Sequence, residues 1–77
     1  MKGYINKQKY SDQVVSLRLR DEMDRLGMSI KDLAKTLDVS YASAFAMAHG
    51  NSELHAAQAK RLEDEWGCDA AWLLCLT

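Results

Sequence analysis

Proline is absent from this chain of 77 residues, and glycine occurs only four times. Proline breaks helices and glycine destabilises them, so their scarcity favours continuous helices joined by short turns. A chain of this length forms one small domain, which buries about 60% of the surface that its unfolded form exposes. With 48% apolar and 27% charged residues, the composition is typical of a globular protein and excludes a disordered tail.

The sequence also has only two cysteines and no long apolar run. Cys68 and Cys75 lie seven residues apart. Along a helix this is roughly 10 Å, which is too far for a disulfide, so we expect reduced cysteines that pack as small core residues. No segment is long and apolar enough for a membrane span or a signal peptide. The sequence therefore predicts a cytoplasmic protein with no membrane partner.

Residue patterns that could hold a metal or perform catalysis are lacking as well. His49 and His55 lie six residues apart, with neither cysteine near them in the sequence, which is poor spacing for metal ligands. The serines lack the Gly-x-Ser-x-Gly context of a nucleophile, and the acidic run Glu63-Asp64-Glu65 is typical of a solvated helix face. We therefore predict no catalytic residue, no metal, no cofactor and no enzymatic activity.

The net charge of −1 is distributed unevenly along the chain. Residues 1–20 hold five basic residues against one acidic residue, a balance of +4, whereas residues 21–77 hold five basic against ten acidic residues, a balance of −5. Because screening limits the reach of distant carboxylates to about 10 Å, a basic arm on an acidic domain can still face phosphates. On charge alone, a solvated leader fits equally well. The sequence thus divides into a basic N-terminal arm over residues 1–10 and a folded domain over residues 11–77.

Apolar residues recur with helical spacing in five segments. The first helix is predicted to begin at Ser11 or Asp12 and to end before Gly27, and the second to run from the N-cap Ser29 to near Asp38. The third helix is predicted to cover residues 41–48. The fourth is predicted to begin at Asn51 or Ser52 and to end before Gly67, and the fifth to follow Asp69 over residues 70–76. The pattern therefore predicts an all-α protein, a compact bundle of five short helices.

Residues 29–50 hold the pattern that bears most directly on function. Two short helices joined by three residues must cross steeply and pack closely, which requires a small residue such as Ala34 midway along the first helix. The turn requires a residue that tolerates a left-handed backbone, and Asp38 is one of the few non-glycine types that does. Val39 would fill the angle between the helices. The side of the second helix that faces inward would carry Ala44, Met47 and Ala48.

This pattern resembles the helix-turn-helix of the phage Cro and repressor family. The matching residues are Leu26-Gly27-Met28-Ser29, Leu33-Ala34 and Leu37-Asp38-Val39-Ser40, and the similarity extends from Val15 to the ending Trp72-Leu73-Leu74. The resemblance implies the lambda repressor-like DNA-binding fold, with the helix-turn-helix at the centre of a five-helix bundle. Three positions depart from the family pattern. Asp38 replaces the usual glycine, Ala44 replaces a branched aliphatic residue, and Ile30 replaces a polar residue that grips a phosphate in some members.

By this resemblance the chain would be a transcriptional regulator in the cytoplasm of a bacterial host cell. It would be a Cro-like repressor of a phage or prophage promoter that binds a double-stranded DNA operator as a homodimer. The second helix of the motif would enter the major groove. Base edges would be contacted by Tyr41, Ala42, Ser43, Phe45 and Ala46. Phosphates would be contacted by Ser29, Lys31, Lys35, Ser40, His49 and Asn51, and by Lys2, Lys7 and Lys9 of the arm.

The chemistry of the groove-facing helix is unusual for a reader of bases. No Arg, Lys, Asn or Gln occurs between residues 40 and 49, so the bidentate contacts with guanine and adenine are missing. What remains is apolar contact with thymine methyl groups from Ala42, Phe45 or Ala46, and hydroxyl hydrogen bonds from Tyr41 and Ser43. In the alternative interpretation, Tyr41 and Phe45 cover the core or join a protein interface.

A protein-interaction module on the same scaffold, such as an antitoxin or an anti-repressor, is the rival function. The uncharged second helix of the motif and the acidic C-terminal half favour it. A homodimer interface is predicted at the C-terminus, because the apolar residues 72–76 are more than one short helix can bury against a small bundle. The alternative is that this segment merely closes the core.

Overall fold

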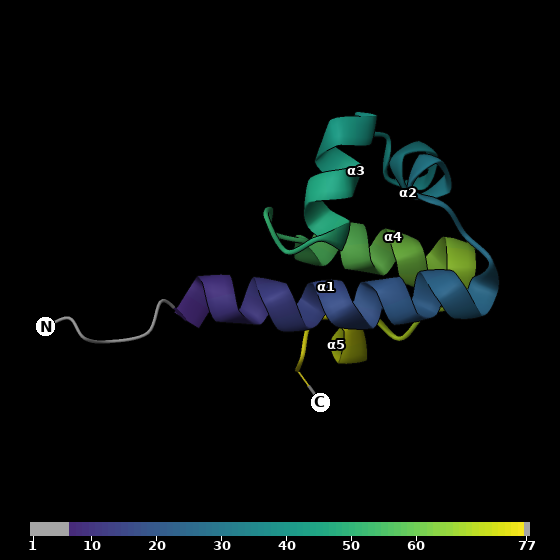
Figure 1. Ribbon diagram of the computed structural model, residues 1–77. Coiled ribbons are helices and arrows are strands. Elements are labelled where there is room, and N and C mark those ends of the chain that lie inside the picture. Colours follow the sequence, from purple (N-terminus) through teal and green to yellow (C-terminus); the bar gives the residue numbers. More distant parts are fainter. Residues whose placement is uncertain (1–6, 77) are drawn as a thin grey trace, which may run out of the picture.

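The computed structural model describes the backbone of residues 7–76 and the side chains of residues 12–76, and in this range it contains helices and no strand (Figure 1). The helices are α1 (Lys7–Leu26), α2 (Ile30–Leu37), α3 (Tyr41–Ala48), α4 (Ala56–Trp66) and α5 (Ala70–Leu73). In the view of Figure 1, α1 runs across the molecule with α2, α3 and α4 on one side and α5 on the other. The predicted all-α class and the five predicted helices are confirmed for these residues.

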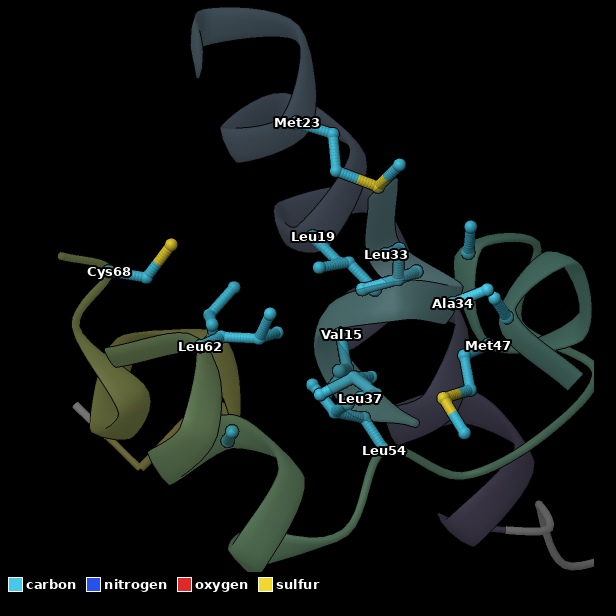
Figure 2. Close-up of a cluster of buried hydrophobic side chains, with 14 residues drawn as sticks. Val15, Leu19, Met23, Leu33, Ala34, Leu37, Met47, Leu54, Leu62 and Cys68 are labelled. Atoms are coloured by element: carbon cyan, nitrogen blue, oxygen red, sulfur yellow. The ribbon is translucent and has the colours of Figure 1, made fainter. Parts of the chain in front are cut away.

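The five helices pack in a closed ring. α1 contacts α3, α3 contacts α2, α2 contacts α4, α4 contacts α5, and α5 returns to α1. Each of the four large leucines with no exposed surface comes from a different helix, namely Leu19, Leu33, Leu62 and Leu73. They share one core with the smaller buried residues of α3 (Figure 2). Because all five helices contribute to this core, none of them buries its apolar face without the others.

The chain leaves each helix through a residue with a left-handed backbone. These residues are Gly27, Asp38, Gly50, Gly67 and Cys75. After α2, for example, the Val39 N–H donates to the carbonyl of Ala34 at 3.0 Å, and the Asp38 N–H donates to that of Lys35 at 3.3 Å. This pair of hydrogen bonds satisfies helix-end carbonyls while it reverses the chain within a few residues. The predicted ends of the first four helices are therefore correct.

Two predicted helix starts are wrong. α1 begins at Lys7 rather than at Ser11 or Asp12, so residues 7–10 of the predicted arm are helical. Lysine and glutamine are good helix formers, and they extend the helix through the serine that was expected to cap it. The position of Lys2 lies outside the described residues, as do the side chains of Lys7 and Lys9.

The second wrong start is that of α4, which begins at Ala56 rather than at Asn51 or Ser52. Residues 51–55 form a loop, in which Leu54 is buried in the core without being helical. The helix starts where the His55 N–H donates to Oε1 of Gln58 at 2.9 Å. Asn51 and Ser52 are residue types that favour turns over helix interiors, which is consistent with the loop.

α5 is shorter than predicted, because it ends at Leu73 and Cys75 then takes a left-handed backbone. Side chains of the neighbouring helices hold it in place. The Arg18 guanidinium lies 4.8 Å from the centre of the Trp72 ring and donates a hydrogen bond to the Trp72 carbonyl. The Ala70 N–H donates to the carboxylate of Glu63 at 3.0 Å. None of the helices in the described part of the chain is long and apolar enough to cross a membrane.

α1 and α3 approach each other closely at Gly50. A Cβ atom at this position would lie 3.1 Å from Oγ of Ser16 and 3.3 Å from Cα of Gln13, both on α1. Gly50 also has a φ of +77°, a backbone conformation that side chains disfavour. The residue is therefore required twice, once for the turn after α3 and once for the contact between the helices.

Comparison of two glycines can separate these requirements. Gly67 has the same φ of +77°, but a Cβ atom there would meet nothing within 4 Å. Gly67→Ala should lower the free energy of unfolding by about 1–2 kcal/mol, the strain of a left-handed alanine. Gly50→Ala should cost at least about 1 kcal/mol more, because the new methyl group overpacks the contact with α1. Urea unfolding of both variants measures the difference, and equal losses would contradict the tight contact.

Candidate nucleic-acid interface

The N-terminus of α2 is closed by its own side chains. The Asp32 N–H donates to Oγ of Ser29 at 3.1 Å, and the Ser29 N–H donates to Oδ2 of Asp32 at 2.8 Å, which completes a capping box. The Ser29 hydroxyl donates to the same carboxylate oxygen at 3.0 Å. Hydrogen bonds from the Ser29 backbone N–H and hydroxyl lower the pKa of Asp32. A carboxylate thus occupies the helix end at which Ser29 was expected to meet a phosphate.

The connection between α2 and α3 consists of three residues, Asp38, Val39 and Ser40. Asp38 has φ 56° and ψ 48°, which is the left-handed conformation expected from the sequence. Val39 is half-buried and packs against the core. The predicted left-handed backbone of Asp38 is therefore confirmed.

The N-terminus of α3 is capped by Ser40. The Ser43 N–H donates to Oγ of Ser40 at 3.0 Å, and the Ser40 hydroxyl donates in turn to Oγ of Ser43 at 3.0 Å. This direction leaves the proton of the Ser43 hydroxyl able to donate to another group. Ser43 is thus the better placed of the two hydroxyls for a contact outside the protein.

α3 has one packed face and one exposed face. Ala44, Met47 and Ala48 are buried in the core, as predicted. On the other face, Tyr41 is 58% exposed and Phe45 45% exposed. The exposed or half-exposed residues beside them are Ala42, Ser43, Ala46 and His49. The structure therefore brings all five predicted base-contacting residues onto the outer side of one helix, together with His49.

Three rings follow one another along this exposed face. The centroids of Tyr41 and Phe45 are 6.4 Å apart with a 28° angle between their planes. Those of Phe45 and His49 are 4.1 Å apart with a 30° angle. We call Tyr41, Phe45 and His49 the aromatic column. His49 was expected to contact a phosphate, and its contact with Phe45 was not predicted, although the spacing of four residues was a signal for it.

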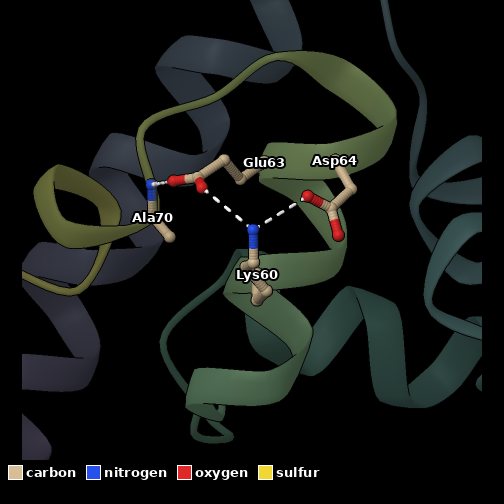
Figure 3. Close-up of polar contacts among 4 residues, drawn as sticks. All are labelled: Lys60, Glu63, Asp64 and Ala70. Atoms are coloured by element: carbon tan, nitrogen blue, oxygen red, sulfur yellow. Dashed lines mark hydrogen bonds and ion pairs between the residues drawn. The ribbon is translucent and has the colours of Figure 1, made fainter.

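The cations nearest to α3 in the sequence lie on α2, where Lys31 and Lys35 are exposed. The cations of α4 are engaged within the protein. The ammonium of Lys60 donates to Glu63 at 3.3 Å and to Asp64 at 3.0 Å (Figure 3). The Arg61 guanidinium donates to the carbonyl of Thr36 at 3.2 Å. Lys31 and Lys35 are therefore better placed than the α4 cations for contact with an anion.

The remaining predicted phosphate contacts lie shortly after α3 and at the start of α1. Asn51 is exposed, and its backbone N–H donates to the carbonyl of Ala46 at 2.8 Å. The N-terminal end of α1, where Lys7 and Lys9 begin the helix, extends beyond α3 and α4 (Figure 1). The predicted phosphate contacts are thus spread around α3 and are not gathered in one cluster.

Groups that could perform other chemistry are sparse. In the part of the chain that the structure describes, no cluster of three or more His, Cys, Asp or Glu could hold a metal ion. Both cysteines are free, and burial raises the pKa of the Cys68 thiol to about 11. Cys68 is therefore a protonated packing residue at neutral pH. No family model, curated protein or solved structure matches the chain.

The left-handed turn yields a test at Asp38, whose side chain is exposed. Asp38→Val should lower the free energy of unfolding by about 1–2 kcal/mol, because a β-branched residue is strained at positive φ. Asp38→Asn should be nearly neutral, since asparagine tolerates this conformation. Asp24→Val makes the same exchange at an exposed position inside α1 and should also be nearly neutral. Thermal or urea unfolding measures the change in stability of each variant. Equal losses for Asp38→Val and Asp24→Val would mean that the turn is unstrained.

Proposed function

We propose that the chain is a sequence-specific double-stranded DNA-binding protein in which α2 and α3 form a helix-turn-helix. The observation that carries the proposal is the division of α3 into a face packed in the core and an exposed face free of charged side chains. An exposed helix fits the major groove, which is about 12 Å wide. The three-residue turn with a left-handed Asp38 has the length and geometry of such a motif.

Phosphate contacts would hold the helix in the groove. Lys31 and Lys35 supply cations from α2, and the exposed Asn51 lies shortly after the end of α3. Lys7 and Lys9 stand at the end of α1 that extends beyond α3. With the resemblance to the Cro and repressor family, these features support a lambda repressor-like fold. The role they favour is that of a Cro-like repressor of a phage or prophage promoter, without enzymatic activity.

A protein-interaction module, such as an antitoxin or an anti-repressor, is the second candidate. The exposed face of α3 favours it, because aromatic residues are enriched and charged residues depleted at the centres of protein interfaces. The same face lacks the arginine, lysine and amide side chains that usually read bases.

Retention on heparin and on a nonspecific DNA column at low salt distinguishes the two functions. A DNA-binding protein is retained on both and elutes as the salt concentration rises, because its phosphate contacts release counterions. A protein with net charge −1 and no phosphate contacts passes through both columns. Flow-through on both would overturn the proposal in favour of the interaction module.

A pair of lysine variants tests the phosphate contacts. Lys35→Ala should weaken binding to a nonspecific duplex and reduce the slope of log K against log salt by about 0.9. Lys60→Ala removes the same charge from an ammonium that already donates to Glu63 and Asp64, so the slope should stay unchanged. Titrations at several salt concentrations measure both. An unchanged slope for Lys35→Ala would exclude Lys35 as a phosphate contact.

We also propose that the regulator is a homodimer, with the exposed Leu76 of the apolar C-terminal segment in the interface. Leu76 is 73% exposed there, whereas Leu73 belongs to the core. Removal of residues 72–76 would therefore unfold the chain, and a single substitution is the sharper test. Sedimentation of the native protein at tens of micromolar should show a dimer, and Leu76→Asp should give a folded monomer. Ala57→Asp adds the same charge at an exposed position of α4 and should remain dimeric. A native monomer would contradict the proposal.

A further inference from the structure

The exposed face of α3 carries a specific arrangement of rings. Phe45 lies between Tyr41 and His49, and the His49 ring is the closer neighbour, at 4.1 Å between centroids. A ring that contacts both neighbours has less rotational freedom than an isolated exposed side chain. The aromatic column is therefore a preformed apolar surface, which loses little side-chain entropy when it contacts a ligand.

The spacing of the rings suits the repeat of a DNA duplex. Residues four apart in a helix are separated by about 6 Å along its axis. Successive nucleotides of one strand are separated by about 3.4 Å along the duplex. Neighbouring rings of the column therefore advance by about two base pairs where the helix follows the groove.

The chemistry of the face limits what it can distinguish in the groove. Tyr41, Ala42, Phe45 and Ala46 offer apolar carbon, with hydroxyl groups only on Tyr41 and Ser43. The apolar group that a natural base pair presents in the major groove is the C5-methyl group of thymine. 5-Methylcytosine carries a methyl group on the same ring carbon, whereas uracil and cytosine lack it.

We propose that the aromatic column makes α3 a reader of pyrimidine C5-methyl groups, with Tyr41 and Phe45 contacting two of them and His49 positioning the Phe45 ring. This inference rests on the proposed function, because it requires α3 to lie in the major groove. To that function it adds the chemical group that α3 recognises, the C5-methyl group of a pyrimidine. It also replaces the assignment of His49 to a phosphate with a role on the base-reading face.

The first experiment uses the full chain and a duplex selected from a random library. Each thymine of the selected duplex is replaced singly by uracil, which removes only the methyl group. Two positions about two base pairs apart should each lose about fivefold in affinity, the low end of discrimination by one base contact. At these positions, a 5-methylcytosine·guanine pair should bind more tightly than a cytosine·guanine pair by a similar factor. If affinity falls with uracil but does not rise with 5-methylcytosine, the methyl group is read only on thymine.

The second experiment assigns the effect to the column through the ratio of affinities for the thymine and uracil duplexes. Phe45→Ala should bring this ratio close to one at one of the two positions, and Tyr41→Ala should do so at the other, because each ring contacts one methyl group. His49→Ala should lower the ratio in part, and His49→Tyr should restore it, because a ring again supports Phe45. Ser43→Ala is the matched control on the same face, and it should weaken binding to both duplexes equally.

The outcomes separate this inference from the proposed function. Failure to bind any duplex at low salt would overturn the proposed function itself. Binding with equal affinity for the thymine and uracil forms at every position would overturn the methyl reading and leave DNA binding intact. A ratio that persists at both positions in Phe45→Ala and in Tyr41→Ala would show that the methyl contacts come from outside the column, which also overturns the inference.

Discussion

The left-handed backbone at Asp38 is the constraint on which the arrangement of the candidate interface depends. It reverses the chain within three residues, so α3 has to pack against α2. At its other end, α3 is held to α1 by Gly50, where no side chain fits without displacement. α3 is apolar on both sides, so its own sequence does not select the side that is buried. The positions of its two ends, set by Asp38 and Gly50, determine which side is buried, and they leave the aromatic column exposed to solvent.

The same constraint explains which parts of the structure could be predicted from the sequence. Ser29, Asp38 and Gly67 act through hydrogen bonds and backbone preferences within a few residues, so their roles could be derived from the local sequence. The starts of α1 and α4 could not, because each results from a competition between neighbouring residue types. Leu54 shows the difficulty most clearly, since it lies within the predicted fourth helix but is buried in the core from a loop.

For the candidate interface, the sequence predicted the exposed residues of α3 but not how their side chains meet. The residue numbers 41, 45 and 49 place three rings on one line of a helix, and this spacing was sufficient to suggest a column. The Phe45–His49 contact additionally depends on side-chain rotamers, which the sequence does not specify. The arrangement at the C-terminus was beyond local reasoning, because Arg18 and Trp72 are 54 residues apart.

Stability and binding make opposing demands at the N-terminus of α2. The Asp32 carboxylate completes the capping box and receives hydrogen bonds from Ser29, but it also brings a negative charge to a helix end that could otherwise face a phosphate. Within residues 29–50, two lysines are balanced by two aspartates. The candidate interface is therefore electrically neutral, and long-range attraction to DNA would have to come from the basic residues near the N-terminus of α1.

The closed ring of helices has a consequence for how the molecule forms. The contact between α1 and α5 joins the beginning and the end of the described fold, so the ring cannot close during synthesis until Trp72 has left the ribosome. Until then, the face of α1 that carries Leu19 has no complete core to enter. The nascent chain would present this apolar surface until α5 emerges, and the core would then form as one cooperative event.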